Sequence, residues 1–557
     1  GSNFESLVDA VRQGLVPEEK INNSVRRLLK ARFELGEMEP EHPFADIPDS
    51  IVDCQAHRAL ALQMARETMV LLQNKKNVLP LKPNATVAVV GPNANDSVMQ
   101  WANYNGTPSH TVTLLKALRQ RLPEGKVIYE QICGHTEGYI WNSLFPACSI
   151  DGKRGFAATY WNNREAAGEV AATDQVESPF HFSGEGSTAF AAGVNLKDFT
   201  GRYVTTFRPD HAGKAHFRLM TNGRVKFFLD GKQVCEQYNI KNPANVYTFP
   251  FEAGKEYRIE LAFEQVKDNP FFNFDLVEEG AMDMKAILKR LKKADVVIFA
   301  GGISPLLEGE AMSVAAEGFK GGDRTTIELP RVQREVMAAL KQAGKKVVMV
   351  NFSGSAMGLK PETESCDAIL QAWYPGQEGG TAIAEVLFGD YNPAGRLPVT
   401  FYESDAQLPD FLDYHMAGRT YRYFKGQPLF AFGYGMSYTT FEYGDATADR
   451  DTVAYGETVR LRIPVTNTGK RDGDEVVQVY LRRPGDTEGP LKALRGFRRV
   501  NIAKGETCEV EIELPYENFQ WFDTASNSMH PMEGVYEVLY GGSSRDEDLK
   551  TLSVTVE

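Results

Sequence analysis

The chain has 557 residues, 42% of them hydrophobic and 24% charged, and a formal net charge of −13. Its length exceeds the roughly 250–300 residues that one hydrophobic core serves, so we expect several domains. The acidic balance argues against a nucleic-acid partner, which needs a basic face. No apolar run approaches the roughly 20 residues that span a bilayer, which argues against a membrane partner.

Motifs for metals, nucleotides and disulfides are missing from the sequence. Six cysteines are scattered along the chain without a C-x-x-C pair or a histidine cluster nearby, so no zinc site or redox compartment is indicated. Neither a phosphate-binding P-loop nor a glycine-rich dinucleotide fingerprint follows a predicted strand. The sequence therefore implies no cofactor.

Residues 1–48 predict helical structure that needs a partner. Apolar side chains keep nearly helical spacing across one break at Pro17, and they are Val8, Val11, Leu15, Ile21, Val25, Leu28 and Leu29. Their stripe would otherwise face water, so we expect the chain to begin inside a larger protein. Gly1 and Ser2 are alternatively an expression scar.

Helix and strand patterns then alternate, which is typical of α/β units. They predict a helix at residues 56–72, a strand at 86–90, a helix at 114–122 and a strand at 126–129. Beyond residue 280 the same alternation returns, with strands at 295–300, 346–351 and 368–372 and helices at 285–292, 331–342 and 379–388.

Residues 151–280 instead alternate apolar and polar side chains, which predicts an all-β module of antiparallel hairpins. The clearest stretches are 215–219, 225–229 and 257–263, with a turn at 230–232. Either one α/β domain is interrupted by this module, or two independent α/β domains flank it. We favour the first arrangement, because neither half has enough strands for a covered sheet.

Residues 446–557 are again rich in strand patterns. Predicted strands lie at 458–465, 476–481 and 535–539, separated by turns such as 467–470. Several strands within about 110 residues indicate an immunoglobulin-like or fibronectin-III-like sandwich.

A loop that carries glutamates leaves the buried strand predicted at residues 295–300. Glu308 and Glu310 follow two glycines after that strand. Open α/β sheets place their chemistry at the carboxyl ends of such strands. A partly desolvated glutamate there suits general acid/base work, since burial raises its pKa. The competing interpretation is an exposed acidic loop.

Five groups of segments occur in order along the chain. They are RALALQMARE (58–67) with LPL (79–81), VGPNAN (90–95) with NYNGTPS (103–109), GFAATYW (155–161), PGQEGG (375–380) with LFGDYNPAGRLP (387–398), and FGYGMSYTTF (432–441). Together they resemble glycoside hydrolase family 3 over nearly the whole chain. The NYNGTPS segment is similar to the family's β-xylosidase branch, and GFAATYW resembles a PA14 domain, a known insertion in this family.

The resemblance implies a multidomain fold. Its parts are the end of a barrel domain and a linker (1–48), an α/β sandwich domain (49–150 and 281–405), an inserted all-β PA14-like domain (151–280), a linker (406–445) and a fibronectin-III-like β-sandwich (446–557). Family members begin with a TIM-like barrel that carries the aspartate nucleophile, and no Asp here matches its motif. We therefore expect the chain by itself to be nearly inactive.

The implied function is that of a retaining exo-glycosidase. It would hydrolyse terminal β-D-xylosyl, or alternatively β-D-glucosyl, residues of plant oligosaccharides, with an oligosaccharide as partner and no metal or organic cofactor. The NYNGTPS segment favours xylosyl. The rival interpretation is a non-catalytic carbohydrate-binding protein of PA14 and sandwich modules. We expect a periplasmic or extracellular location, and a homo-oligomer is left open.

The family takes its acid/base from the glutamate loop. The resemblance favours Glu308 for this role. Because the length of this loop varies among relatives, Glu310 is kept as the second choice and Glu317 as the third. Asp323 and Arg324 are expected to form a structural pair that shapes the loop.

A second loop supplies candidate substrate contacts. Trp101, Asn103 and Tyr104 are placed there because aromatic faces and amides suit hydroxyl-rich ligands. The alternative is a packed loop under the inserted β module.

Overall fold

A computed structural model of the chain describes all residues except 1, 40–45, 107, 185–187, 311 and 313. It divides into a helical unit, residues 1–60, and a larger unit, residues 61–557. In the part of the chain that is described, no helix is both long and apolar enough to cross a membrane.

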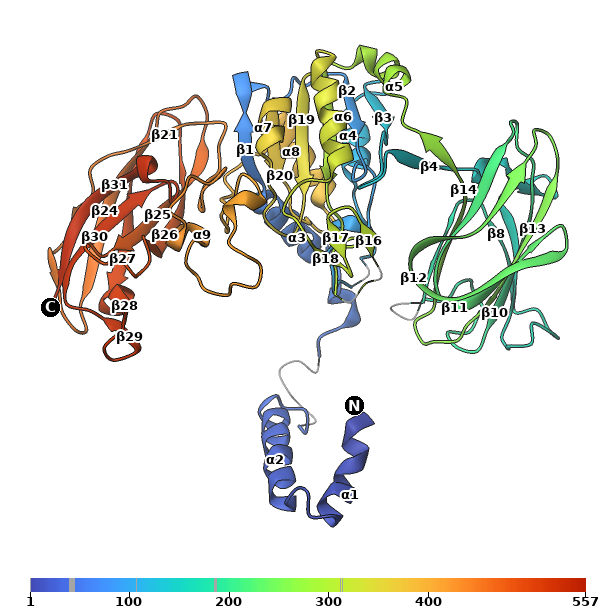
Figure 1. Cartoon of the computed structure of the whole chain (residues 1–557), viewed down its shortest axis with the longest axis horizontal. Helices are drawn as coiled ribbons and strands as arrows, with labels where there is room; N and C mark the ends of the chain where they lie inside the picture. The colour runs from blue at the N-terminus through green and yellow to red at the C-terminus, as the bar shows by residue number, and fades with distance from the viewer. Residues whose placement is uncertain (1, 40–45, 107, 185–187, 311, 313) are drawn as a thin grey trace. The chain divides into compact units, whose positions relative to one another are not determined.

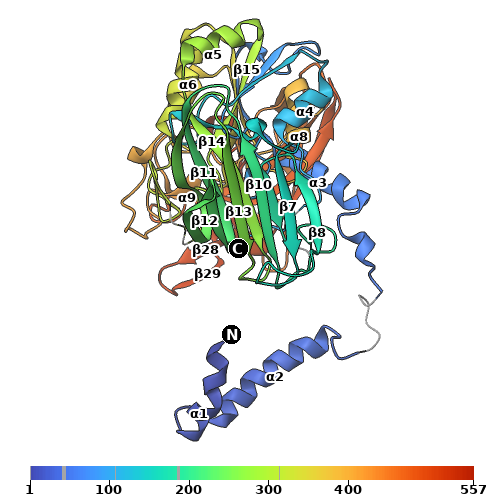
Figure 2. The same ribbon diagram turned by 90° about the vertical axis from the view of Figure 1, so that its right-hand side faces the viewer.

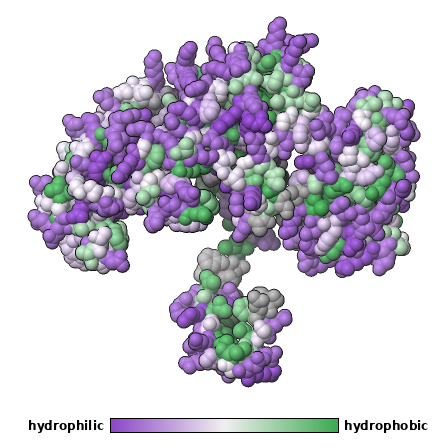
Figure 3. Space-filling model, in the orientation of Figure 1, coloured by the Kyte–Doolittle hydropathy of each residue, from purple (hydrophilic) through white to green (hydrophobic). Residues whose placement is uncertain are grey.

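The helical unit carries apolar side chains that face solvent. After a short 3-10 turn, α1 (Leu7–Arg12) and α2 (Glu18–Glu34) are separated at Pro17, as predicted. Leu15 and Leu28 are 71% and 68% exposed, and neither helix has a buried residue. Apolar surface gathers over this unit in the space-filling view (Figure 3). These helices show the unpartnered stripe that their spacing predicts.

One six-stranded sheet forms the centre of the α/β domain. Its order is β1 (Val70–Asn74), β20 (Ala368–Gln371), β19 (Val347–Phe352), β15 (Val296–Gly302), β2 (Val87–Val90) and β3 (Val127–Glu130). Three of these strands precede the inserted module and three follow it. One sheet therefore draws its strands from both sides of the module, as in the first of the two predicted arrangements.

Helices cover both faces of this sheet (Figure 1). The apolar faces of α4 (Leu114–Arg121) and α8 (Gly379–Phe388) pack on one side. On the other side lie α5 (Met284–Arg290), α6 (Arg331–Gln342) and the segment around α7 (Lys360–Ser365). The central strands are buried on both faces, which is why they are continuously apolar in sequence.

The helix predicted at residues 56–72 is too long. Helix α3 spans Gln55–Thr68, and the following residues form β1, which pairs antiparallel with β20. Leu71 and Leu72 are buried in the sheet and not on a helix face. Their apolar run suits either element, so periodicity alone did not separate them.

The inserted module is an antiparallel β structure with an aromatic core (Figure 2). Its strands are β4 (Tyr139–Ser143), β5 (Cys148–Ile150), β6 (Lys153–Arg154), β7 (Phe156–Trp161), β8 (Ala172–Val176), β9 (Phe180–Ser183), β10 (Thr200–Phe207), β11 (Gly213–Leu229), β12 (Lys232–Phe251), β13 (Tyr257–Glu264) and β14 (Phe271–Ala281). Two predicted strands, 215–219 and 225–229, belong to the single long strand β11. Strands β4 and β5 pair within this module although they precede residue 151.

The C-terminal residues form two packed β-sheets, as predicted. One contains β21 (Phe441–Tyr443), β22 (Thr447–Ala448), β24 (Thr458–Asn467) and β27 (Thr507–Pro515). The other contains β23 (Thr452–Val453), β25 (Gly473–Arg482), β26 (Ala493–Ile502), β30 (Gly534–Gly541) and β31 (Leu549–Val556). Alternate residues of β24 and β27 are buried in a shared core. A small hairpin, β28 (Gln520–Asp523) and β29 (Ser528–Pro531), lies outside these sheets.

Candidate active site

The loops that leave β2, β15, β19 and β20 meet at one edge of the sheet. These four strands are parallel neighbours, so their carboxyl ends share that edge. Such an edge is where open α/β sheets bind ligands. The predicted glutamate loop follows β15, and it therefore lies in the expected place.

Glu308 is held in a turn directly after β15. Its backbone N–H donates to the carbonyl of Ser304 at 3.1 Å, and Leu307 does the same at 2.8 Å. The side chain is half-buried, and its Oε1 accepts a hydrogen bond from the hydroxyl of Tyr374 at 2.5 Å. A carboxyl group is thus fixed at the sheet edge by a residue from another loop.

Tyr374 follows β20 and was not singled out by the sequence. The preceding residue, Trp373, has a φ of 59°, and its indole N–H donates to the carbonyl of Thr68 at 3.0 Å. A positive φ is uncommon for a bulky residue and needs surrounding support. Burial, followed by the nearby charge of Glu308, raises the pKa of Tyr374 far above its ordinary value. The phenol therefore stays protonated and acts as a donor.

Gly354, after β19, leaves space for both groups. A Cβ atom there would lie 3.1 Å from the Tyr374 ring and 3.4 Å from the Glu308 Oε1. Three loops from three neighbouring strands therefore meet around one carboxyl group.

The loop after β2 touches the same site. The Asn103 amide donates to the backbone carbonyl of Glu308 at 2.9 Å, and the Tyr104 hydroxyl bonds Glu310. Trp101 instead donates its indole N–H to Thr111 at 2.8 Å. The structure thus brings Asn103 and Tyr104 to the glutamate loop, while Trp101 bonds a residue of its own loop.

The three candidate glutamates have different surroundings. Glu310 is exposed, and Glu317 is exposed and pairs with Arg331 at 3.6 Å. Glu308 is half-buried and so is its donor Tyr374, whereas Tyr104, which bonds Glu310, is exposed. Partial burial with a fixed donor suits an acid/base better than an exposed position does. The assignment of Glu308 stays a prediction.

The expected pair of Asp323 and Arg324 is wrong. Both lie on β18 (Asp323–Arg324), the last strand of a small hairpin with β16 (Ala315–Ala316) and β17 (Phe319–Lys320). Neighbours on a strand point to opposite faces, so Asp323 is exposed while Arg324 turns inward. The Arg324 guanidinium donates to Ser355 Oγ at 2.7 Å and to the carbonyl of Ala356 at 2.9 Å.

Burial lowers the pKa of Arg324, and the negative charge of Glu308 opposes that effect. Among the described residues its Nη2 has no hydrogen-bond partner, although it is buried. A positive charge thus stands near Glu308 and Tyr374 with bonding capacity left over. Sequence reasoning missed this role because it paired Arg324 with its chain neighbour.

A buried polar network supports the glutamate loop from below. The Asn93 amide donates to the carbonyls of Gly301 and Ile303, at 3.2 Å each. Gln333 on α6 bonds both the N–H and the carbonyl of Gly302, at 2.8 Å each. These side chains satisfy backbone groups where β15 ends, so the loop leaves the sheet in a defined direction.

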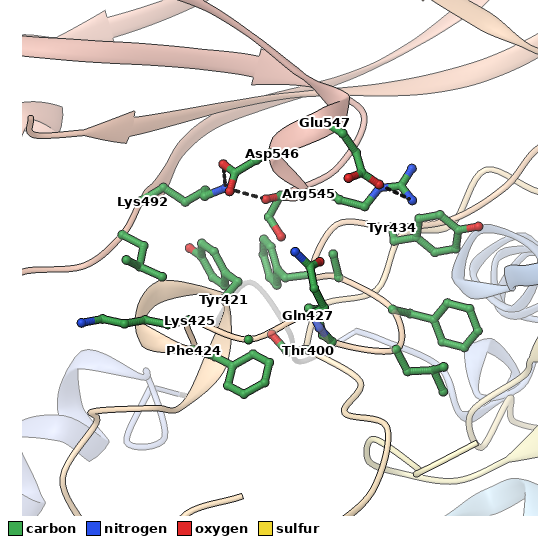
Figure 4. Close-up of a pocket in the computed structure, with 18 residues that line it drawn as sticks. Thr400, Tyr421, Phe424, Lys425, Gln427, Tyr434, Lys492, Arg545, Asp546 and Glu547 are labelled. Atoms are coloured by element: carbon green, nitrogen blue, oxygen red, sulfur yellow. Dashed lines mark hydrogen bonds and ion pairs between the residues drawn. The ribbon is translucent and has the colours of Figure 1, made fainter. Parts of the chain in front are cut away.

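A different cavity, of about 550 Å³, lies beside the sandwich (Figure 4). It is lined by the linker that contains α9 (Thr420–Tyr423) and by sandwich residues such as Lys492 and Asp546. The Lys492 ammonium already donates to Asp546 and to the carbonyl of Ser544, at 2.5 and 2.8 Å. None of the predicted site residues lines this cavity. In the described part of the chain, no cluster of three His, Cys, Asp or Glu residues could hold a metal ion.

Comparison with known proteins supplies the family. The model for the Glycosyl hydrolase family 3 C-terminal domain matches residues 69–438, and a Fibronectin type III-like domain model matches residues 475–544. A xylan 1,4-beta-xylosidase of Xylanibacter ruminicola is 46% identical over 559 residues, covering 99% of this chain and 64% of that enzyme. A beta-glucosidase of Rhizobium radiobacter is 28% identical, covering 97% of this chain and 68% of that protein.

Solved structures show the same fold. A beta-glucosidase from Kluyveromyces marxianus in complex with glucose superposes with a TM-score of 0.74 at 24% identity, covering 99% of this chain and 69% of that one. The chain therefore spans about two thirds of the length of these three proteins. Because the family model matches more than half of its residues, the chain belongs to glycosyl hydrolase family 3.

Proposed function

We propose that this chain forms the acid/base-bearing part of a retaining exo-glycosidase that removes terminal β-D-xylosyl, or else β-D-glucosyl, residues from plant oligosaccharides. The observation that carries the proposal is the Glu308 carboxyl, fixed by Tyr374 at the carboxyl edge of a parallel sheet. The 46% identity to a xylan 1,4-beta-xylosidase and the NYNGTPS segment favour the xylosyl choice.

The second carboxyl group of the reaction is proposed to lie outside this chain. Retaining glycosidases need two carboxyl groups about 5–5.5 Å apart. The relative of 46% identity is longer than this chain, which covers 64% of it. The solvent-facing apolar side chains of α1 and α2 are consistent with a barrel domain that packs on them. The chain by itself is therefore expected to be nearly inactive on aryl β-xylosides.

In the proposed reaction Glu308 acts twice. It first donates a proton to the glycosidic oxygen while the nucleophile forms a bond to the anomeric carbon and the leaving group departs. It then accepts a proton from the water that hydrolyses the glycosyl-enzyme. The β module, which we propose to be a PA14-like insertion, would contribute loops to substrate selection.

The test is Glu308→Gln in the full-length protein. Substrates with acidic leaving groups should still form the glycosyl-enzyme, while oligosaccharides should react roughly 10²–10⁴-fold more slowly. Azide should restore turnover of the substrates with acidic leaving groups, because it attacks the glycosyl-enzyme without losing a proton. Glu310→Gln is the matched control and should be milder on each measurement.

Three results would change the proposal. Azide rescue in Glu310→Gln and not in Glu308→Gln would move the acid/base by two positions. A response of Glu317→Gln only would place it elsewhere in the loop. Oligosaccharide binding without hydrolysis by the unaltered full-length protein would favour the carbohydrate-binding alternative.

A further inference from the structure

We propose that Tyr374 is a positioning residue that orients Glu308 for proton transfer through Oε2. The inference rests on the proposed function, because it assigns a role in the same site. Tyr374 lies 66 positions from Glu308 along the chain, in the loop of a different strand.

The groups on both sides of the Tyr374–Glu308 hydrogen bond are held in place. The Tyr374 hydroxyl lies 2.5 Å from Oε1 of Glu308, which is short for a hydrogen bond between two oxygen atoms. Trp373 turns the chain toward the site with its positive φ and is tied to Thr68. Gly354 supplies the space that any other residue would fill.

The direction of the hydrogen bond follows from the environment. Tyr374 is protonated because burial and the neighbouring carboxylate disfavour the phenolate. The cation Arg324 interacts electrostatically with both groups and so does not choose between them, whereas a carboxyl group is ordinarily far more acidic than a phenol. Tyr374 is therefore the donor and Glu308 Oε1 the acceptor.

This geometry selects one carboxyl oxygen for chemistry. When a phenol O–H points at Oε1, the proton of the carboxylic acid must reside on Oε2. Oε2 then gives the proton to the departing oxygen and later takes one from water. Without Tyr374 the carboxyl group can rotate and hold its proton on either oxygen, which loses orientation and hence rate.

The experiment compares Tyr374→Phe with the unaltered full-length protein. We expect kcat/KM on substrates with poor leaving groups to fall roughly 10- to 100-fold, the scale of a hydrogen bond to a charged group. KM should change little, because the lost contact is to Glu308 and not to the sugar. The loss should grow as the leaving group becomes less acidic, because those substrates depend most on the proton that Glu308 donates.

A matched control exists in the sandwich. There the Tyr443 hydroxyl donates to Oε1 of Glu475 at 2.7 Å, so Tyr443→Phe removes the same kind of bond at another place. It should leave kcat/KM and its dependence on the leaving group unchanged. The double variant Glu308→Gln/Tyr374→Phe should be no slower than Glu308→Gln alone, since Tyr374 acts through Glu308.

The outcomes separate the two proposals. If Glu308→Gln shows no dependence on the leaving group, the proposed function fails. If Glu308→Gln behaves as expected but Tyr374→Phe matches the unaltered protein in rate and in leaving-group dependence, the positioning role is overturned. A large additional loss in the double variant would also overturn it. If Tyr374→Phe proves unstable to heat, Gly354→Ala, which crowds both side chains, should give the same loss on substrates with poor leaving groups.

Discussion

At the scale of single residues, the carboxyl group of Glu362 inside the α/β domain should make stability depend on pH. It lies on α7 and is fully buried, and its Oε1 accepts from Nε of Arg334 at 3.0 Å. Arg334 is shared with Glu328, whose Oε2 lies 2.6 Å from Nη2. Burial raises the pKa of Glu362 to about 7, although the Arg334 charge opposes the rise. The folded protein thus favours the protonated acid more than the unfolded chain does.

The sign of the resulting pH dependence is fixed. Between pH 4.5, the ordinary pKa of this group, and about 7, the folded state binds more protons than the unfolded state. The contribution of this group to the free energy of unfolding is therefore complete below pH 4.5. It is lost as the pH rises toward 7, by up to about 1.4 kcal/mol per pH unit. Urea unfolding of Glu362→Gln should show a flatter pH dependence over this window. Glu335→Gln, at an exposed pair with Arg331, should not, and equal slopes in both variants would contradict the assignment.

The other instructive residue is Arg324. Its separation from Glu308 along the chain gives no hint of their electrostatic interaction, and its neighbour Asp323 offered an obvious partner. The strand β18 decides the matter, because adjacent side chains point to opposite faces. Opposite charges that are adjacent in sequence therefore do not predict an ion pair when the two residues lie on a strand.

At the scale of elements, the end of β15 depends on a close approach to β19. Gly302 has a φ of +110°, and a Cβ there would lie 2.1 Å from the carbonyl oxygen of Phe352. The same carbonyl accepts from the N–H of Ile303 at 2.8 Å, so it cannot move away without breaking that bond. The glutamate loop starts from this point.

We therefore expect Gly302→Ala to lower the free energy of unfolding by at least about 2 kcal/mol. Gly344→Ala is the matched control, since Gly344 has a φ of +75° and no atom within 4 Å of an added Cβ. It carries only the backbone penalty of an alanine in the left-handed region, about 1–2 kcal/mol. Chemical denaturation measures both, and equal losses would show that the approach to Phe352 does not matter.

At the scale of the whole molecule, the β module leaves and re-enters the α/β domain at adjacent points. Tyr139 of β4 pairs with Ala281 of β14, so the two ends of the module are neighbours in one antiparallel ladder. The six-stranded sheet takes no strand from the module. Each part therefore has its own core.

Excision of residues 139–281, with a short Gly/Ser linker in their place, should leave a soluble remainder that unfolds cooperatively. Circular dichroism during heating checks this, and limited proteolysis should give a stable core. If the remainder shows no cooperative transition, the module stabilises the six-stranded sheet through β4 and β14, the two strands at its ends.

The sequence by itself determined the elements and their class. Continuous apolar runs predicted β15 and β19, alternation predicted the β module and the sandwich, and helical spacing predicted α6 and α8 with the bounds observed. Each of these patterns follows from which side chains of a single element are buried, so it can be read from a short stretch of sequence. The glutamate loop was found for the same reason, because it follows a buried strand directly.

Only the tertiary structure decided what surrounds Glu308. Tyr374, Gly354 and Asn103 belong to the loops of three other strands, and they meet because β20, β19, β15 and β2 lie side by side in that order. Strand order depends on how connections cross the sheet, and it leaves no periodicity in any one segment. Local patterns therefore placed a carboxyl group at the edge, while the packing of the strands supplied the groups that hold it.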